Sequence, residues 1–180
     1  KVKEIIGLLA EGKNLALVTD AGTPGISDPG NMLVHNVIAS AAKQSHGNQE
    51  IAASSRVLGT PRNDTVIPIP GPSAVTSALS ISGFPTDKFL FLGFPPHKNK
   101  RQKFFKEVAS AEHTVVFYES PHRIKKCLGE LSAVLEPNRG LVVCRELTKK
   151  FESIYRGTIA DILKMNISEK GEFVIVVNSK

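Results

Sequence analysis

Tryptophan is absent from the sequence, cysteine occurs only twice, and there is no long apolar run. Cys127 and Cys144 are too few for the disulfide framework of a small secreted protein, and no CxxC or Cys/His spacing suits a metal. No window approaches the roughly 18 to 20 apolar residues that a membrane span requires. The first residues lead into an amphipathic helix rather than a signal peptide. We therefore expect a cytoplasmic protein with no bound metal and no membrane partner.

A globular composition and an excess of positive charge are what the chain does have. Its 180 residues are 41% hydrophobic and 22% charged, close to the average for globular proteins. This length suits one large domain or two small ones. There are 23 lysines and arginines against 17 aspartates and glutamates, a net charge of +6. The excess favours an anionic partner such as nucleic acid, although many basic proteins bind none.

Short apolar runs followed by Gly/Pro loops recur in the first half of the chain. Residues 15–18 and 66–69 are apolar stretches of the kind found in strands that are buried on both faces. Each runs into a loop rich in glycine and proline and then into a predicted helix. The repeated order of strand, loop and helix predicts an α/β fold with a parallel sheet.

Further strands and amphipathic helices are predicted in the second half. Ser120 and Pro121 form a favourable start for a helix, and Thr158 and Asp161 have the spacing of a capping box. Three apolar runs predict strands, at residues 114–118, 141–144 and 173–177.

The stretch 84–96 is interpreted as a bridge between two domains. It contains an apolar run at 89–92 and ends in two prolines. We therefore predict an N-terminal α/β domain over residues 1–92 and a C-terminal α/β domain over residues 93–180.

Residues 39–64 interrupt this rhythm. The segment is rich in Ala, Ser, Gln and Asn and has no aromatic residue, whereas helix-to-strand loops in α/β units usually take roughly 2 to 6 residues. Its composition resembles that of an in-frame repeat element of the kind found in some bacterial genomes. We predict a disordered surface insertion, with a functional loop as the alternative.

Two Gly/Pro loops are the candidate ligand-binding elements. The first contains Gly22, Gly25 and Gly30, and the second is the segment 70–74. Glycines allow positive φ and let a ligand approach the backbone closely. The spacing is neither GxGxxG nor GK[ST], so neither a dinucleotide fold nor a P-loop is supported. One such loop is as readily a structural turn as a site, but two favour a shared binding cleft.

Seven motifs occur together and in order along the chain. They are TDAGTPGISDPG, VIPIPGPSA, GFPTDKFLFLGFPP, VFYESPHRI, CRELTKKFE, RGT and GEFVIVV. Together they resemble the tetrapyrrole-methylase-fold enzymes, and specifically the branch that methylates a cytidine ribose 2′-hydroxyl in small-subunit ribosomal RNA. The resemblance covers almost all of the chain outside residues 39–64.

The resemblance implies two α/β domains with S-adenosylmethionine in the cleft between them, and it suggests a homodimer. It also implies that ribosomal RNA or the small ribosomal subunit is the partner. The implied cofactor contacts come from the first loop, the second loop and the strand ends of the second domain: Asp20, Ala21, Gly22, Thr23, Gly25, Ile26, Ser73, Ala74, Tyr118, Glu119, Gly171 and Glu172.

Three residues are candidates for catalysis. Methyl transfer from a sulfonium is an in-line displacement, so positioning can supply most of the rate. A ribose hydroxyl is a poor nucleophile and is helped by a general base. Glu119, His122 and Glu146 are the candidates, and the sequence does not choose among them. His122 is equally explained as a solvated residue at a helix start, and Glu146 as an ion-pair partner of Arg145.

Basic residues cluster in three places in the predicted second domain. Lysine and arginine that neutralise phosphates supply sequence-independent RNA affinity, although any single charged cluster is usually a solvated face. The candidate RNA contacts are Lys98, Lys100, Arg101, Arg123, Lys149 and Lys150.

The chain also departs from the family pattern. The family begins with a further strand and glycine-containing loop upstream of Lys1, and it often has a helical extension after the last strand. These departures raise one rival reading, a truncated or degraded copy that is inactive or depends on a partner. A separate rival is a methyltransferase of the same fold that acts on a small tetrapyrrole. The PHRI and RELTKK motifs and the basic residues argue against the tetrapyrrole.

Overall fold

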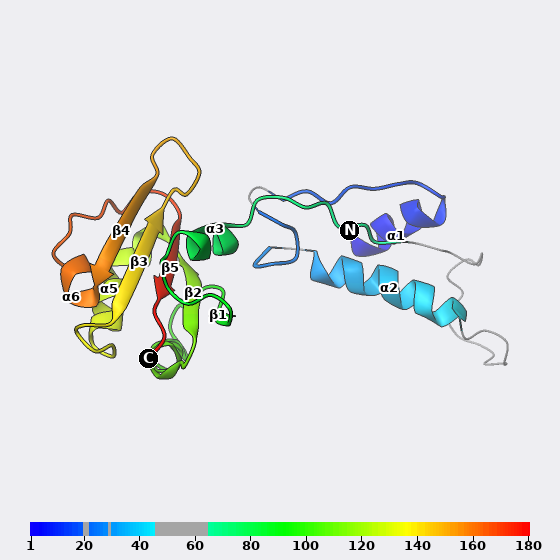
Figure 1. Cartoon of the computed structure of the whole chain (residues 1–180). Coiled ribbons are helices and arrows are strands. Elements are labelled where there is room, and N and C mark those ends of the chain that lie inside the picture. The colour runs from blue at the N-terminus through cyan, green and yellow to red at the C-terminus, as the bar shows by residue number, and fades with distance from the viewer. Residues whose placement is uncertain (20–21, 29, 46–64) are drawn as a thin grey trace. The chain divides into compact units, whose positions relative to one another are not determined.

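The computed structural model describes residues 1–19, 22–28, 30–45 and 65–180. The chain divides into two compact units, Lys1–Pro72 and Ser73–Lys180 (Figure 1). The sequence placed a boundary later, at residues 92 and 93. The difference arises because the segment after Ser73 supplies a helix and a strand that pack within the second unit.

A five-stranded mixed sheet organises the second unit. Its strands are β1 (Phe89–Phe91), β2 (Thr114–Glu119), β3 (Gly140–Arg145), β4 (Ser153–Thr158) and β5 (Phe173–Val177). They lie in the order β1-β2-β5-β3-β4. The pair β1–β2 is parallel and the other pairs are antiparallel. The strands predicted at 114–118, 141–144 and 173–177 are confirmed as β2, β3 and β5.

Helices cover both faces of this sheet. The helices are α3 (Ala74–Ser80), α4 (Arg101–Ser110), η1 (Pro121–Arg123), α5 (Ile124–Ser132) and α6 (Ile159–Ile162). Helix α3 packs on one face, against side chains such as Val116 and Val176. Helices α4, α5 and α6 pack on the other, against side chains such as Phe117 and Ile175 (Figure 1). Every residue of β5 is buried, because this strand has a neighbour on each side and helices on each face.

Alternation along β2 sends successive side chains to opposite faces of the sheet. Val115 and Phe117 belong to the core under α4 and α5. Val116 belongs to the core under α3, and Tyr118 packs against that core. The same period of two places Glu119 on the α4/α5 face. Tyr118 and Glu119 are neighbours in the sequence, but their side chains lie on opposite faces of the sheet.

Strand β4 was missed by sequence reasoning. It is an edge strand bonded only to β3, and none of its residues is fully buried. An edge strand of this kind carries no continuous apolar run, so the pattern that marks the central strands is absent. The capping box is confirmed: Thr158 and Asp161 bond reciprocally at the start of α6.

Both cysteines fill core space, as predicted. Cys127 and Cys144 are fully buried. Burial raises the pKa of the Cys144 thiol to about 11 and raises that of Cys127 well above its usual value. Neither thiol is therefore suited to act as a nucleophile.

The first unit contains the helices α1 (Val2–Ala10) and α2 (Asn31–Ser45). The strands predicted at 15–18 and 66–69 are not formed. Val18 is 84% exposed and Ile69 is 78% exposed. A strand requires a hydrogen-bonded neighbour, and no strand pairing occurs in this unit among the described residues. The predicted parallel sheet of the first half is thus wrong for the described chain.

The first residues of the predicted insertion are part of a helix. Helix α2 continues to Ser45, so residues 39–45 are helical and not disordered. The alanines in this stretch favour helix. The rest of the predicted insertion, residues 46–64, lies outside the described residues. Within the described part of the chain, no helix has the length and apolarity to cross a membrane.

Candidate cofactor and RNA site

The ends of three neighbouring strands meet at one edge of the second unit's sheet. Phe173, at the start of β5, pairs with Glu119 at the end of β2 and with Arg145 at the end of β3. The residues that flank these ends include several of the predicted site residues: Tyr118, Glu119, Glu146, Gly171 and Glu172. The structure therefore brings together residues that lie far apart in the sequence.

Glu146 and Glu172 are bonded to each other at this edge. The backbone N–H of Glu172 donates to Glu146 Oε1 at 2.8 Å, and that of Glu146 donates to the Glu172 carbonyl at 2.9 Å. Gly171 fits beside them because it has no side chain. A Cβ there would lie 2.5 Å from Glu146 Cγ, and its φ of +99° favours glycine. Gly171 therefore has a packing role next to the predicted site.

Charge is balanced around this contact. The Glu172 N–H holds the pKa of Glu146 below its usual value, with a smaller contribution from Lys149. Lys149 Nζ lies 2.8 Å from Glu172 Oε2 and 3.4 Å from Glu146 Oε1. The hydrogen bond to Glu172 raises the pKa of Lys149. Glu146 is thus an ionised hydrogen-bond acceptor and a weak proton acceptor.

Tyr118 lies on the α3 face of the edge. Its ring centroid is 5.2 Å from that of Phe91 and 5.3 Å from that of Phe94. Ala74, in the first turn of α3, packs against the same core as Tyr118. Ser73 caps this helix, and its Oγ accepts from the Thr76 N–H at 3.5 Å. The predicted contacts Ala74 and Tyr118 therefore share one face of the sheet, and Ser73 precedes the helix that covers it.

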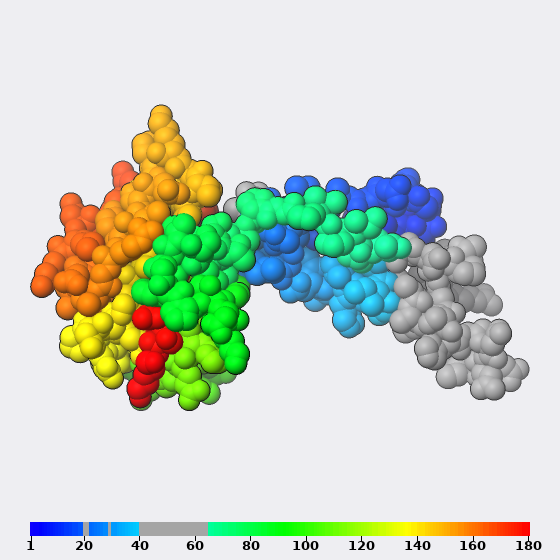
Figure 2. Space-filling view, in the orientation of Figure 1, coloured from blue at the N-terminus to red at the C-terminus, as the bar shows by residue number. Residues whose placement is uncertain are grey.

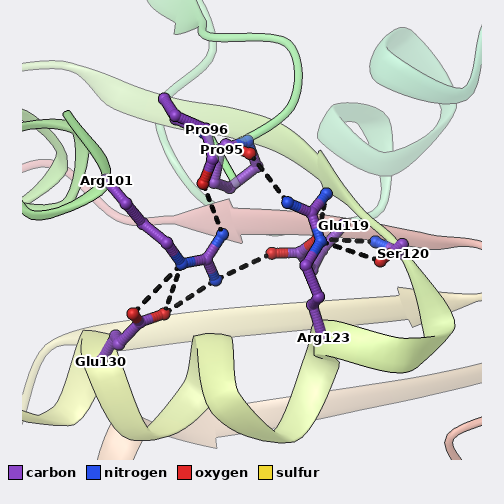
Figure 3. A network of polar contacts seen from close by, with 7 residues as sticks. All are labelled: Pro95, Pro96, Arg101, Glu119, Ser120, Arg123 and Glu130. Carbon is purple, nitrogen blue, oxygen red and sulfur yellow. Dashed lines mark hydrogen bonds and ion pairs between the residues drawn. The ribbon is translucent and has the colours of Figure 1, made fainter. Parts of the chain in front are cut away.

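A buried charge network lies on the opposite face (Figure 3). Glu119 Oε2 accepts from Arg101 Nη2 at 3.1 Å, and Glu119 Oε1 lies 2.9 Å from Arg123 Nη2. Oε1 also accepts from the Ser120 N–H at 2.7 Å. Arg101 continues the network through Glu130, at 2.7 Å from Nη2.

The same two arginines donate hydrogen bonds to Pro95 and Pro96, which lie inside the second unit. Arg123 Nη1 donates to the Pro95 carbonyl and Arg101 Nη1 to the Pro96 carbonyl, each at 3.1 Å (Figure 3). Arg101 also lies over the Phe105 ring, 5.0 Å from its centroid. Burial lowers the pKa of Arg101, but the hydrogen bonds to Glu130 and Glu119 outweigh it, so the net pKa is raised. The network therefore fixes Pro95 and Pro96 to the end of β2.

These contacts correct three sequence predictions. The Glu119 side chain is fully buried and both of its oxygens are occupied, so it is not placed to serve as a base or to touch a cofactor on the α3 face. Arg101 is 4% exposed, and so it does not offer its charge to RNA. Arg123 donates through each of its three nitrogens within the network, to Ser120, Pro95 and Glu119. Arg123 is therefore not free to bind RNA phosphates. All three residues instead stabilise the end of β2.

The remaining second-unit candidates lie at the surface. His122 is exposed in η1, directly after the strand end. Lys98, Lys100 and Lys150 are also exposed, whereas Lys149 is ion-paired with Glu146 and Glu172. The structure thus separates basic residues that are free for phosphate from those that hold the fold.

The first loop is described in part. Gly22 and Gly25 have φ values of +84° and +87°, and Thr19 Oγ1 donates to the Gly22 carbonyl at 3.1 Å. The Ile26 N–H reaches the Thr23 carbonyl at 3.4 Å. Asp20 and Ala21 lie outside the described residues. Among the described residues there is no cluster of His, Cys, Asp or Glu that suits a metal ion.

Sequence reasoning missed the partnership of Glu130 with Arg101 and the role of the two proline carbonyls. The two residues lie 29 positions apart in the sequence, so no local spacing connects them. The one available signal was Arg123, four residues after the glutamate that ends an apolar strand. Charge patterns alone do not distinguish such a buried cluster from a solvated one.

Comparison with known proteins identifies the class to which this fold belongs, that of the methylases. Residues 1–163 match the family of Tetrapyrrole (Corrin/Porphyrin) Methylases, and the chain belongs to this family. The fold agrees with that of the methyltransferase CobJ, with a TM-score of 0.62 at 19% identity over 99% of this chain and 70% of that one. Cobalt precorrin-4 methyltransferase CbiF gives 0.57 at 17% identity over 98% and 69%.

Particular relatives are more similar in sequence. "Ribosomal RNA small subunit methyltransferase I" of Synechocystis sp. is 40% identical over 98% of this chain, and the match covers 57% of that protein. The protein of the same name from Hydrogenobaculum sp. is 38% identical over 100% of this chain and 70% of its own length. The chain therefore spans little more than half the length of some of the relatives it matches.

Proposed function

We propose that this chain forms much of an S-adenosylmethionine-dependent methyltransferase that modifies the ribose 2′-hydroxyl of a cytidine in small-subunit ribosomal RNA. The observation that carries the proposal is the similarity to relatives named as small-subunit rRNA methyltransferases, which extends over nearly the whole chain. The similarity to corrin-pathway methyltransferases supports the fold alone. Exposed Lys98, Lys100 and Lys150 supply charge that suits RNA phosphates.

Each unit, taken by itself, has residues that suit a nucleoside cofactor. Gly22 leaves its backbone open, since an added Cβ would meet nothing closer than 3.9 Å. Ala74 and Tyr118 offer a small side chain and an aromatic ring on the same face. When bound, S-adenosylmethionine supplies an electrophilic methyl group on a sulfonium. The chain's own residues have to hold the two reactants in line and exclude water.

The proton of the ribose hydroxyl requires an acceptor in this proposal. Of the three predicted candidates, Glu119 is buried in ion pairs and Glu146 has a lowered pKa. His122 is the candidate with an exposed side chain next to the strand end. We therefore propose His122 as the general base. His122→Ala should lower kcat roughly 100-fold or more while affinity for S-adenosylmethionine stays unchanged.

Two measurements test the proposed function. Calorimetric titration with S-adenosylmethionine should show binding, and labelled methyl should then transfer to small ribosomal subunits and not to a tetrapyrrole. Absence of binding at millimolar ligand would favour the inactive remnant. Transfer to the tetrapyrrole alone would favour the other branch of the family.

Surface charge offers a matched pair of variants for the RNA. Replacing Lys98 and Lys100 with alanine should raise KM for RNA and weaken its salt dependence, because two phosphate contacts are lost. The control replaces two other exposed lysines, Lys126 and Lys164, with alanine, so that the same amount of charge is lost elsewhere. Equal effects of both variants would mean that net charge, and not position, matters.

A bacterial cytoplasmic location and a homodimer belong to the same proposal. Sedimentation of the purified chain tests the dimer.

A further inference from the structure

The loop between β3 and β4, residues 146–152 and called here the β3–β4 loop, is held rigidly. Arg145 Nη1 donates to the Phe151 carbonyl at 2.9 Å, and the Thr148 N–H donates to Glu152 Oε2 at 2.7 Å. Lys149 ties the loop to Glu172, next to β5. The hydrogen bonds and ion pairs run from the loop base to its tip, so the loop has a defined shape.

Two residues of this loop adopt a conformation that side chains disfavour. Glu146 and Thr148 have φ values of +49° and +64°. Such left-handed residues persist only where neighbouring contacts hold them, and they concentrate at functional sites. The contacts of Glu146 with Glu172 and of Thr148 with Glu152 supply that hold. The loop therefore maintains a strained shape at its tip.

The strained loop presents an aromatic ring to solvent. Phe151 is 63% exposed, and Lys150 Nζ lies 5.7 Å from the centroid of its ring. Lys150 has no ion pair among the described residues. Figure 2 shows the loop, coloured between yellow and orange, projecting beyond the rest of the sheet. The Phe151 ring is thus held in water beside the positive charge of Lys150. Exposure of its apolar surface to water has a free-energy cost that covering the ring would remove.

We propose that Phe151 is a stacking platform for an unpaired base of the RNA substrate, and that Lys150 contacts the adjoining phosphate. The inference rests on the proposed function and deepens it by naming a recognition site. Single-stranded nucleic acids are bound by exposed aromatic rings that stack on bases and by basic residues that follow the backbone. Both elements occur here side by side, on a loop that begins at the same sheet edge as the candidate site.

The surroundings of Phe151 favour RNA over a second protein surface. Protein interfaces place their aromatic residues within apolar cores from which lysine is depleted. The neighbours of Phe151 are instead exposed and polar: Thr148, Lys149, Lys150 and Glu152. A single ring with a polar, basic margin matches a base better than it matches an apolar patch on another copy of this chain.

The test uses the full chain and a short single-stranded RNA that contains the fluorescent base 2-aminopurine, whose emission is quenched by stacking. Phe151→Ala should weaken binding about 5- to 150-fold and remove the quenching. Phe151→Trp should restore both. Phe151→Leu keeps the apolar character without a ring and should behave like alanine. Leu163→Ala, at another exposed apolar position of the same unit, is the matched control and should bind as the unchanged chain does.

The outcomes separate this inference from the proposed function. Equal RNA affinity and quenching in the unchanged chain and in Phe151→Ala would overturn the inference, as would absence of RNA binding. A shift of Phe151→Ala towards monomer in sedimentation, with RNA affinity unchanged, would overturn it in favour of a protein interface. The chain could also fail to bind S-adenosylmethionine while its RNA binding still depends on the Phe151 ring. That result would contradict the proposed methyl transfer and support the stacking site.

Discussion

The two units of this protein treat similar apolar runs in opposite ways. In the second unit, Phe173–Val177 is a run of five residues that are all buried. In the first unit, Ile67 and Ile69 belong to a run of comparable hydrophobicity, yet they are 71% and 78% exposed. The run in β5 has a hydrogen-bonded strand on each side. The run that contains Ile67 and Ile69 has none among the described residues. An apolar run becomes a buried strand only when partners supply hydrogen bonds on both sides and cover on both faces.

Charge shows the same contrast. The second unit buries a carboxylate and a guanidinium completely because each has partners for its polar atoms. In the first unit, the described ion pair of Lys13 with Glu11 is exposed, with more than half of each side chain in water. Exposed pairs contribute little to stability, whereas a buried pair becomes strongly destabilising when one member is removed. The largest mutational effects should therefore fall in the second unit.

Removal of the buried carboxylate should have the largest effect. Glu119→Ala leaves Arg101 and Arg123 without their shared partner and should lower the free energy of unfolding of the second unit by about 3–5 kcal/mol. Urea denaturation followed by hydrogen exchange of each unit measures the loss. Glu112→Ala, an exposed glutamate in the same unit, is the control. A loss below about 1 kcal/mol would show that the network adds nothing to the fold.

A pair of isoleucines tests the contrast between buried and exposed runs directly. Ile175 is fully buried in β5, and Ile67 is mostly exposed. Ile175→Ala should cost about 2–5 kcal/mol, and Ile67→Ala should stay within about 0.5 kcal/mol. Both are measured by urea denaturation. A large effect at Ile67 would mean that its side chain is covered in solution, and the contrast between the units would fall.

Two glycines distinguish conformation from packing. Both Gly22 and Gly171 have positive φ, but only at Gly171 would a Cβ collide with another side chain, that of Glu146. Gly22→Ala should cost about 1 kcal/mol for its conformation, and Gly171→Ala about 2–3 kcal/mol because the Glu146 contact is also displaced. Equal losses in the two variants would show that Glu146 moves aside freely.

The smallest expected effect is the titration of Glu146. Its pKa is lowered in the folded chain, so its contribution to the order of the β3–β4 loop is fully present above the ordinary pKa of a glutamate. That contribution is lost as the pH falls through the lowered value. Carbon-13 NMR of the carboxylate should report the lowered pKa, and the loop amides should lose protection from hydrogen exchange over the same range. Glu146→Gln should remove this dependence, and a titration at the ordinary value would contradict the contact with Glu172.

Sequence patterns predicted part of this site. The family resemblance placed Tyr118 and Glu172 beside one cofactor and Glu146 was a candidate base, and the structure brings Glu146 and Glu172 into contact. The opposite fates of Tyr118 and Glu119 were missed, although they follow from the alternation of side chains along a strand. That alternation shows that the two side chains point to opposite faces of the sheet. It does not show which face carries the helices and the arginine that bury Glu119. The exposure of Phe151 was also missed, because the few aromatic residues were interpreted as core, although the neighbours Lys150 and Glu152 are polar.

The sequence by itself determined the elements whose cause is local. Examples are the capping box at Thr158, the central strand β5 and the fill of core space by Cys127 and Cys144. The tertiary structure alone decided which charges are buried and which apolar runs find partners. Glu119 and Glu130 both pair with Arg101, yet the side chain of the first is fully buried and that of the second is 29% exposed. The physical reason is that burial and pairing depend on groups distant in the chain, and only the folded molecule brings those groups together.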